Sequence, residues 1–378
     1  SSILTGRTPY RNGVWRWIPG GHQVHLRTSE ITSAELLKEK GYETCHVGKW
    51  HLNGKFNSKD QPQPDAHGFD HWMATQNNAA PNHRNPRNFV RNGKEVGELE
   101  GYSAPLVVEE GIRWLKEKRD PKKPFFLNVW THEPHLPIES DPKFMELYKE
   151  FEDDGIRQHH GNVTQIDHAF GNLMKALDEL GETENTFVIF TSDNGPWLRF
   201  KHHGGTAGPL RDGKGTTFEG GQRVPCVLRG PGVPAGSVCH ELTGTIDVLP
   251  TLAALVGGAL PSQHRIDGVD MSPLWHGKKE ASSREEFLYY SSHGVLEGIR
   301  QGPWKLLVKL PRQNRNTREP KVAEVLLFNL EEDLGEQENL ADKYPVVVSK
   351  LHTKMEALDA EITSNARPPW FDDDGIAE

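Results

Sequence analysis

The chain has 378 residues, with 44 Lys and Arg against 53 Asp and Glu, so its formal net charge is −9 at pH 7 with neutral histidines. That acidic balance argues against a nucleic-acid-binding protein, and no apolar run approaches the roughly 18 to 20 residues that cross a bilayer. The length fits one large domain plus a smaller one. Three cysteines without metal-ligand spacing are expected to be buried free thiols.

In the first two thirds of the chain, short apolar runs alternate with helical stretches, which is typical of βαβ units rather than of an all-β sandwich. The expected strands cover residues 42–47, 125–130, 186–192 and 224–229. The expected helices cover residues 31–40, 106–118, 163–180 and 247–256. We therefore predict an α/β fold in which these strands form a large mixed, mostly parallel sheet covered by helices.

After about residue 275 the pattern changes to shorter strands, followed by a closing helix. The strands are expected at residues 287–291, 296–300, 305–309 and 325–330, and the helix at 346–362. This pattern predicts a small antiparallel sheet with one helix. We accordingly divide the chain into a main domain, residues 1–280, and a C-terminal α+β subdomain, residues 281–378.

A first candidate site follows the strand at 186–192, where the sequence reads Asp193-Asn194-Gly195-Pro196. Groups just beyond the carboxyl ends of strands line the ligand crevice of open α/β sheets. A carboxylate beside an amide oxygen suits Ca²⁺ or Mg²⁺. Taken alone, the same residues would also fit an ordinary Asx turn.

Two further strand ends carry groups for charge neutralisation and proton transfer. Lys49 and His51 follow the strand at 42–47, and His132, Glu133 and His135 follow the strand at 125–130. A lysine can neutralise an anionic oxygen, and a histidine can move a proton near neutral pH. Taken alone, Lys49 and His51 would also fit a surface lysine and a hydrogen-bonded loop histidine. The two histidines around a carboxylate lack the usual spacing of a zinc site.

A glycine-rich stretch places Lys214 between Gly213 and Gly215, which lets the lysine approach a ligand closely. It is not a P-loop, because the first glycine is misplaced and no Lys-Ser or Lys-Thr pair opens a helix. The three strand ends and this loop are expected to converge on one rim that suits an anionic tetrahedral ester. The residues expected to line the substrate mouth are Trp197, Arg199, His202, His203 and Arg211.

In combination these motifs resemble the type I sulfatases of the alkaline phosphatase superfamily, near the arylsulfatase A and N-acetylgalactosamine-6-sulfatase branch. Leu4-Thr5-Gly6-Arg7 matches the tail of the sulfatase signature, Cys-x-Pro-Ser-Arg-x-x-Leu-Leu-Thr-Gly-Arg. The other matching segments are residues 48–52, 134–135, 192–195 and 213–221. The resemblance implies an alkaline phosphatase-like fold and hydrolysis of the sulfate ester of a sulfated carbohydrate or an aryl sulfate.

The resemblance also implies roles for individual residues. Asp193 and Asn194 would bind Ca²⁺, with Mg²⁺ as an alternative, and Lys49 and Lys214 would neutralise the sulfate oxygens. In the family mechanism a formylglycine hydrate attacks sulfur. The alcohol then leaves with proton help from the side of His135 and Lys214, and the sulfated diol collapses with His51 as base.

The formylglycine of that signature would lie five positions before Ser1, and the family's paired metal-binding aspartates lie further upstream. The chain as given would then be inactive without that segment. The resemblance further implies a formylglycine-generating or anaerobic maturation enzyme as a partner. It also implies export, to the periplasm, the extracellular space or the lysosome.

Two alternatives use the same residues. A phosphomonoester or phosphonate hydrolase of the same superfamily would explain the metal ligands and the cations, although phosphatases usually employ two metals. A non-catalytic binder of sulfated glycans would hold the anion without turning it over. The residue at the first position of the signature distinguishes this binder from a sulfatase.

Overall fold

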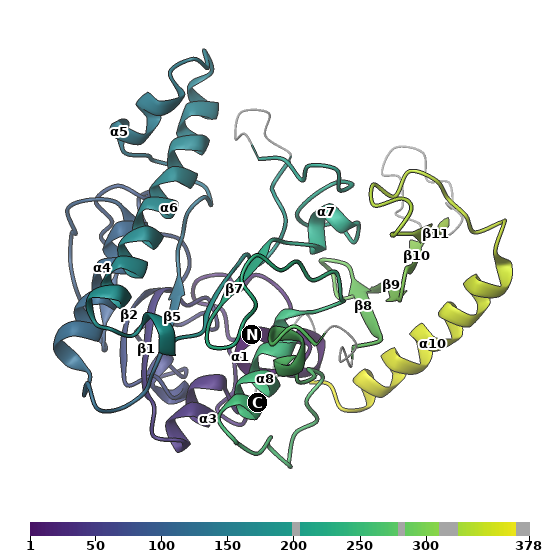
Figure 1. Ribbon diagram of the computed structural model, residues 1–378, viewed down its shortest axis with the longest axis horizontal. Coiled ribbons are helices and arrows are strands. Elements are labelled where there is room, and N and C mark those ends of the chain that lie inside the picture. The colour runs from purple at the N-terminus through teal and green to yellow at the C-terminus, as the bar shows by residue number, and fades with distance from the viewer. Residues whose placement is uncertain (199–204, 279–283, 310–323, 368–378) are drawn as a thin grey trace.

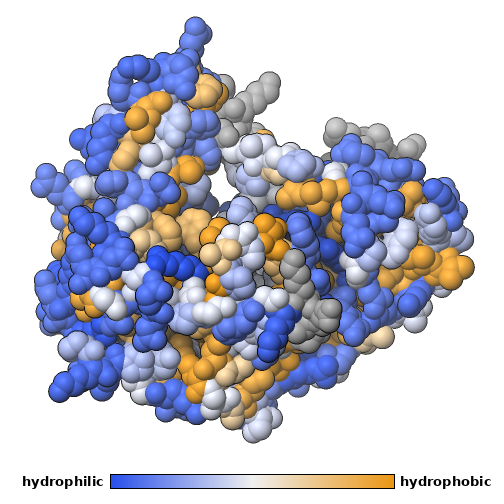
Figure 2. Space-filling view, viewed as in Figure 1, coloured by the Kyte–Doolittle hydropathy of each residue, from blue (hydrophilic) through white to orange (hydrophobic). Residues whose placement is uncertain are grey.

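The computed structural model describes residues 1–198, 205–278, 284–309 and 324–367. Figure 1 shows a large α/β part and a smaller part at the C-terminal end of the chain, with the long helix α10 (Pro345–Ser364) along the outer side. The space-filling view is hollowed between the arm formed by α5 (Pro142–Met145) and α6 (Asp154–Glu179) and the region of α7 (Glu219–Gln222) (Figure 2). Among the described helices, none is both long and apolar enough to cross a membrane.

The main sheet has five strands in the order β4-β3-β2-β1-β5. The strands are β1 (Glu43–Lys49), β2 (His71–Thr75), β3 (Val90–Arg91), β4 (Lys94–Glu95) and β5 (Phe125–Trp130). β1 lies between β2 and β5 and runs parallel to both, whereas β3 and β4 are short and antiparallel. Since Thr44 to Gly48 are all buried, β1 is covered on both faces, as expected for the centre of a parallel sheet.

Helices cover the two faces of this sheet. On one face α4 (Ser103–Arg113) and α6 pack through Val107, Val108, Ala169 and Leu173 against Val47. α4 continues into a π-helical turn at Trp114–Lys118. On the other face Trp50, Phe69 and Trp72 pack with Ala34 of α3 (Ser33–Glu39), which begins with a capping box between Thr32 and Glu35.

The remaining helices are short. The further α-helices are α1 (Ser2–Thr5), α2 (Pro9–Asn12), α8 (Val248–Leu255) and α9 (Ser272–Trp275). The 3₁₀ turns are η1 (Pro64–His67), η3 (Glu146–Tyr148), η4 (Thr183–Asn185) and η5 (Thr245–Asp247).

The predicted C-terminal sheet is confirmed. Its order is β11-β10-β9-β8, all antiparallel, with β8 (Glu286–Tyr290), β9 (Leu296–Gln301), β10 (Trp304–Lys309) and β11 (Glu324–Asn329). One face packs on Leu351 and Met355 of α10, and the other face packs on Phe218, which belongs to the glycine-rich stretch of the main part. The predicted boundary between residues 280 and 281 lies in the segment 279–283, outside the described residues, and stays a prediction.

One expectation about the strands is wrong. β6 (Val188–Thr191) and β7 (Cys226–Arg229) were expected in the same mostly parallel sheet, but among the described residues they pair only with each other, in antiparallel orientation. A parallel pair needs a long crossover, usually a helix, and the one helix described between them is the single turn α7. Cys226 and Cys239 are also exposed, so only Cys45 is the buried thiol that was expected.

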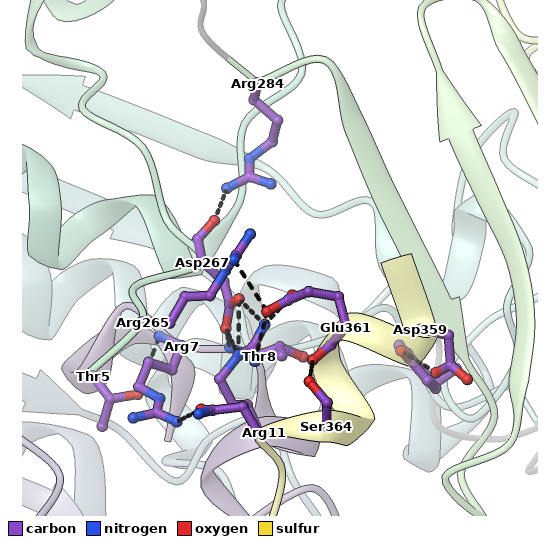
Figure 3. A network of polar contacts seen from close by, with 12 residues as sticks. Thr5, Arg7, Thr8, Arg11, Arg265, Asp267, Arg284, Asp359, Glu361 and Ser364 are labelled. Atoms are coloured by element: carbon purple, nitrogen blue, oxygen red, sulfur yellow. Dashed lines mark hydrogen bonds and ion pairs between the residues drawn. The ribbon is translucent and has the colours of Figure 1, made fainter. Parts of the chain in front are cut away.

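A network of ion pairs around buried Arg11 joins the segment after α1 to helix α10 (Figure 3). The guanidinium of Arg11, with no exposed side-chain surface, lies 2.8 Å from Asp267 and 2.7 Å from Glu361 of α10. Asp267 also accepts a hydrogen bond of 2.8 Å from the backbone N–H of Thr8. These contacts fix the segment after α1 against helix α10.

Replacing Arg11 with Ala should lower the free energy of unfolding by about 3–5 kcal/mol, because it leaves two carboxylates without their buried partner. Urea unfolding followed by circular dichroism measures the difference. Arg265→Ala is the matched control, since Arg265 pairs with the same Glu361 at 3.1 Å but its side chain is 60% exposed; its loss should cost about 0–1 kcal/mol. An equal loss of unfolding free energy in the two variants would contradict the role of Arg11 as the buried partner of both carboxylates.

Candidate active site

The end of β1 brings Lys49 and His51 to the carboxyl edge of the sheet. Gly48 makes this possible, because a Cβ at this position would lie 1.9 Å from the carbonyl oxygen of Trp130 in β5, and its φ is +107°. The chain then leaves the sheet, and His51 adopts a φ of 51°. One imidazole nitrogen of His51, Nε2, lies 3.0 Å from the carbonyl oxygen of buried Ile18.

Lys49 is half-buried, and its ammonium group donates a hydrogen bond of 3.3 Å to Oδ1 of Asn78. Burial lowers its pKa to about 8; the negative charge of Asp193 acts against this shift and the positive charge of Lys214 acts with it. Lys49 is therefore close enough to both residues to feel their charges, although they lie far apart in the sequence. At pH 7 its ammonium form still predominates.

His135 follows β5 and lies at the surface beside the same asparagine. Its Nδ1 lies 3.1 Å from the side-chain nitrogen of Asn78 and 2.7 Å from the carbonyl oxygen of Leu136. The amide of Asn78 also donates a hydrogen bond of 3.1 Å to that carbonyl. Asn78 thus links Lys49 to the loop of His135.

Behind His135 the loop is held by buried hydrogen bonds. His132 Nε2 lies 2.8 Å from Thr75 Oγ1, and one oxygen of Glu133 accepts bonds of 2.7 Å from both the Ser103 hydroxyl and the Ala104 N–H. The described residues contain no group of three or more His, Cys, Asp or Glu side chains placed to hold a metal ion. His132 and Glu133 therefore support the loop, and the zinc alternative has no ligand set in the described part of the chain.

The segment after β6 and the glycine-rich loop pack backbone against backbone. The N–H of Gly195 donates to the carbonyl of Gly221 at 3.2 Å, and the N–H of Lys214 donates to the carbonyl of Pro196 at 2.8 Å. A Cβ on Gly195 would lie 1.8 Å from the carbonyl oxygen of Gly220. The glycines are needed here for close approach, and they place Lys214 beside the predicted metal-binding residues.

The predicted metal ligands offer hard oxygen atoms. Asn194 uses its side-chain N–H for a hydrogen bond of 3.0 Å to the carbonyl of Gly195, and its Oδ1 accepts no hydrogen bond from the described residues. The carboxylate of Asp193 is exposed and makes no hydrogen bond or ion pair with the described residues. These donors fit Ca²⁺ or Mg²⁺, and they would supply two of the six to eight oxygens that Ca²⁺ takes.

The electrostatics of the rim keep both histidines neutral at pH 7. Burial lowers the pKa of His51 to about 3, and the charge of Lys49 acts in the same direction. Partial burial lowers the pKa of His135, and Lys49 and Lys214 contribute to this shift while Asp193 opposes it. The rim therefore combines two cations, two imidazoles able to accept a proton and one carboxylate.

The predicted substrate mouth is only partly described. Trp197 is 37% exposed and follows the predicted metal-binding residues Asp193 and Asn194 in the sequence. Arg211 instead faces the C-terminal subdomain, where it donates to the carbonyl of Glu336 at 2.6 Å and lies 4.0 Å from the ring centroid of Phe218. These contacts do not support its predicted role in substrate binding. The other predicted residues, Arg199, His202 and His203, lie outside the described residues.

Two neighbours of the site were missed by the sequence analysis. Asn78 comes just after β2, a strand that was not predicted, so the rule about strand ends would have found it. Trp17 is 57% exposed, and its ring centroid lies 6.4 Å from that of His51. An exposed tryptophan has no local sequence pattern, and only the fold places it beside the site.

A rim of lysines and neutral histidines at the strand ends of an α/β sheet is typical of hydrolases that act on tetrahedral anionic esters. The sulfatase family model matches residues 1–259, which include every one of these groups, so the chain belongs to the sulfatase family.

The chain is similar to sulfatases along most of its length. It is 32% identical to N-acetylgalactosamine-6-sulfatase of Canis lupus familiaris, over 89% of this chain and 71% of that protein. It is also 32% identical to human arylsulfatase A, over 96% of this chain and 78% of that protein. Among solved structures, Ps i-CgsB in complex with k-i-k-neocarrahexaose has a TM-score of 0.81 at 27% identity and covers 94% of this chain and 80% of its own.

Proposed function

We propose that the protein hydrolyses the sulfate esters of carbohydrates, with a formylglycine nucleophile located upstream of residue 1. The observation that carries this proposal is the rim at the ends of β1, β5 and β6, where two cations and two neutral imidazoles surround one carboxylate. The named relatives are sulfatases, which favours this function over the phosphatase and binding-protein alternatives.

Each residue of the rim has a role in this reaction. Lys49 and Lys214 hold the sulfate oxygens and stabilise the negative charge that builds up in the transition state. On the side of His135, the ammonium group of Lys214 donates the proton that the alcohol oxygen takes up as its bond to sulfur breaks, and His135 assists this transfer. His51 accepts a proton when the sulfated enzyme releases inorganic sulfate.

Asp193 and Asn194 would hold Ca²⁺, which when bound supplies positive charge to the sulfate oxygens. Two negative groups, the sulfate and Asp193, then face three positive ones. Without Ca²⁺ between them, the carboxylate of Asp193 would repel the anionic sulfate. The carboxylate supports this assignment, because it is exposed in a cationic rim and has no hydrogen-bond or ion-pair partner among the described residues.

The position of Ser1 supports a nucleophile in the preceding signature residues. The backbone nitrogen of Ser1 is buried and lies near Asp193 and His51. Residues joined to this group would therefore enter the site directly. Conversion of the nucleophile to formylglycine would require a formylglycine-generating or anaerobic maturation enzyme. The family resemblance also implies export of the protein.

The experiment that tests this function uses the full-length protein, co-produced with a maturation enzyme. Peptide mass spectrometry should find an aldehyde five positions before Ser1. Hydrolysis of 4-nitrophenyl sulfate should exceed that of 4-nitrophenyl phosphate by about 100-fold in kcat/KM. An unmodified serine or threonine with higher phosphatase activity would favour the phosphatase, and a residue unable to act as nucleophile would favour the binding protein.

A carbohydrate substrate is supported by the two exposed tryptophans, since indole rings stack on the apolar faces of sugars. The names of the relatives include a sulfatase for N-acetylgalactosamine 6-sulfate, and Ps i-CgsB was solved with an oligosaccharide. We expect Trp17, next to His51, to contact the sugar that carries the sulfate or its neighbour.

Replacing Trp17 with Ala should raise KM for a sulfated oligosaccharide about 10-fold, through the loss of one stacking contact, and should leave kcat/KM for 4-nitrophenyl sulfate within about 2-fold. Steady-state kinetics with both substrates measure the difference. The control is Leu147→Ala, a large apolar residue that is 61% exposed on η3. Equal effects of Trp17→Ala on both substrates would remove Trp17 from the sugar-binding surface.

A further inference from the structure

A cluster of buried charges joins the glycine-rich loop to the C-terminal sheet. Lys305 of β10 lies 2.9 Å from Glu219 and 2.8 Å from Glu336, and its own side chain has no exposed surface. The side chains of Glu219 and Glu336 are 2% and 0% exposed. The hydroxyl of Tyr289 donates a further bond of 3.1 Å to Glu219.

From this geometry we propose that Lys305 is a positioning residue for Lys214: it fixes the loop that carries this lysine by holding Glu219 and Glu336. The proposal rests on the proposed function, in which Lys214 contacts the sulfate. It assigns a role in the reaction to the C-terminal subdomain, which lies outside the residues matched by the family model.

Glu219 and Glu336 connect Lys305 to the loop. Glu336 holds both ends of the short segment 211–219, because its side chain accepts a bond of 2.7 Å from the N–H of Glu219 and its carbonyl accepts a bond of 2.6 Å from the guanidinium of Arg211. The Gly220 N–H, one residue further, donates back to the Arg211 carbonyl at 2.9 Å. Lys214 lies within the segment that these bonds close.

A second anchor holds the same loop on the C-terminal sheet. Thr217 donates a hydrogen bond of 2.8 Å to Glu297 of β9, and the ring of Phe218 packs with Leu307 and Phe328. Gly221, just beyond, accepts the backbone bond from Gly195. The loop is therefore clamped between the predicted metal-binding segment on one side and the C-terminal sheet on the other.

The cluster is poorly suited to be a device for stability alone. A buried ion pair costs desolvation, and an apolar set of the same volume often stabilises a protein as well or better. Its charges do fix geometry, because the Lys305 ammonium group contacts one oxygen of each carboxylate and the N–H of Glu219 binds the other oxygen of Glu336. The charge of Lys305, together with Arg300, lowers the pKa of Glu219 against the opposing effect of burial, so this carboxylate stays ionised and keeps its partners.

The test compares Lys305→Met with Lys354→Met in the full-length, matured protein. Lys354 is the matched control, because it makes an ion pair of 2.9 Å with Glu286 in the same subdomain and does not touch the loop. Amide hydrogen exchange should become faster at Gly220 and Gly221 in Lys305→Met but not in Lys354→Met. The exchange rates in β1 should stay unchanged in both variants, which shows that both are folded. Unchanged exchange in the loop would overturn the proposal, whether or not the protein is a sulfatase.

The kinetic part of the test uses 4-nitrophenyl sulfate. Lys305→Met should lower kcat/KM about 10- to 100-fold, the loss expected when a catalytic group is displaced by about 1 Å. In a Lys214→Ala background, the same change should have no further effect, because both act through one group. Additive losses would overturn the proposal. Absence of sulfatase activity in the wild-type protein would instead refute the proposed function.

Should Lys305→Met fail to fold, Glu219→Gln provides the same test with the side-chain volume retained. It removes the charge that Lys305 holds and should give the faster loop exchange and the same non-additivity with Lys214→Ala. Normal loop exchange in this folded variant would overturn the proposal.

Discussion

Replacing Lys49 with Ala should lower kcat/KM for 4-nitrophenyl sulfate by about 10²–10³-fold, the usual cost of removing one group that stabilises transition-state charge. Lys49 lies at the centre of the rim, bonded to Asn78 and within reach of the charges of Asp193 and Lys214. Steady-state kinetics on the matured protein measure the loss. A residual activity within a few-fold of wild type would remove Lys49 from the reaction.

The same lysine should set the alkaline limb of the pH profile. Its pKa in the folded protein is about 8, below the ordinary value, because of burial. The charged form is the active one, so kcat/KM should fall as the pH rises through about 8. In Lys49→Arg the charge persists, because the pKa of a guanidinium lies above 12, and this limb should move to higher pH. An unchanged alkaline limb in that variant would assign it to another group.

The amino-acid sequence predicted the C-terminal sheet well because its contacts are local. β8, β9 and β10 follow each other with short connections, and the cross-strand partners Ile299 and Leu306 are both buried. The pairing of β6 with β7 was missed for the opposite reason. Both runs read as strands, but the choice of partner depends on the path of the chain between them, which no local pattern records.

The site residues also divide into those that a local sequence pattern predicts and those that only the fold reveals. Lys49, His51, His135 and Asp193 were predicted as site residues because each follows a predicted strand, and the carboxyl ends of strands gather on one edge of a sheet. Arg211 was assigned to the substrate mouth from its place in the sequence alone. Its guanidinium is bound by Glu336, 125 residues away, and a contact of that range could be known only from the fold.

Asp193→Asn should abolish the stabilisation of the protein by Ca²⁺ and lower kcat/KM by at least about 10³-fold. The carboxylate is the only negative group known to interact with Lys49 and His135 in the described part of the rim. Its loss leaves the two lysines without their counter-charge and removes a hard anionic ligand. The melting temperature, compared in Ca²⁺ and in a chelator, measures the stabilisation by the metal ion independently of activity.

In the wild-type protein, Ca²⁺ should raise the melting temperature, because a ligand that binds only the folded state stabilises it by mass action. Asp212→Asn is the matched control: it makes the same chemical change on an exposed residue of the neighbouring loop, whose side chain accepts a hydrogen bond of 2.9 Å from Gly213. Asparagine also tolerates the φ of 60° found at position 212. A response to Ca²⁺ that survives in Asp193→Asn and is lost in Asp212→Asn would move the metal from the strand end to the glycine-rich loop.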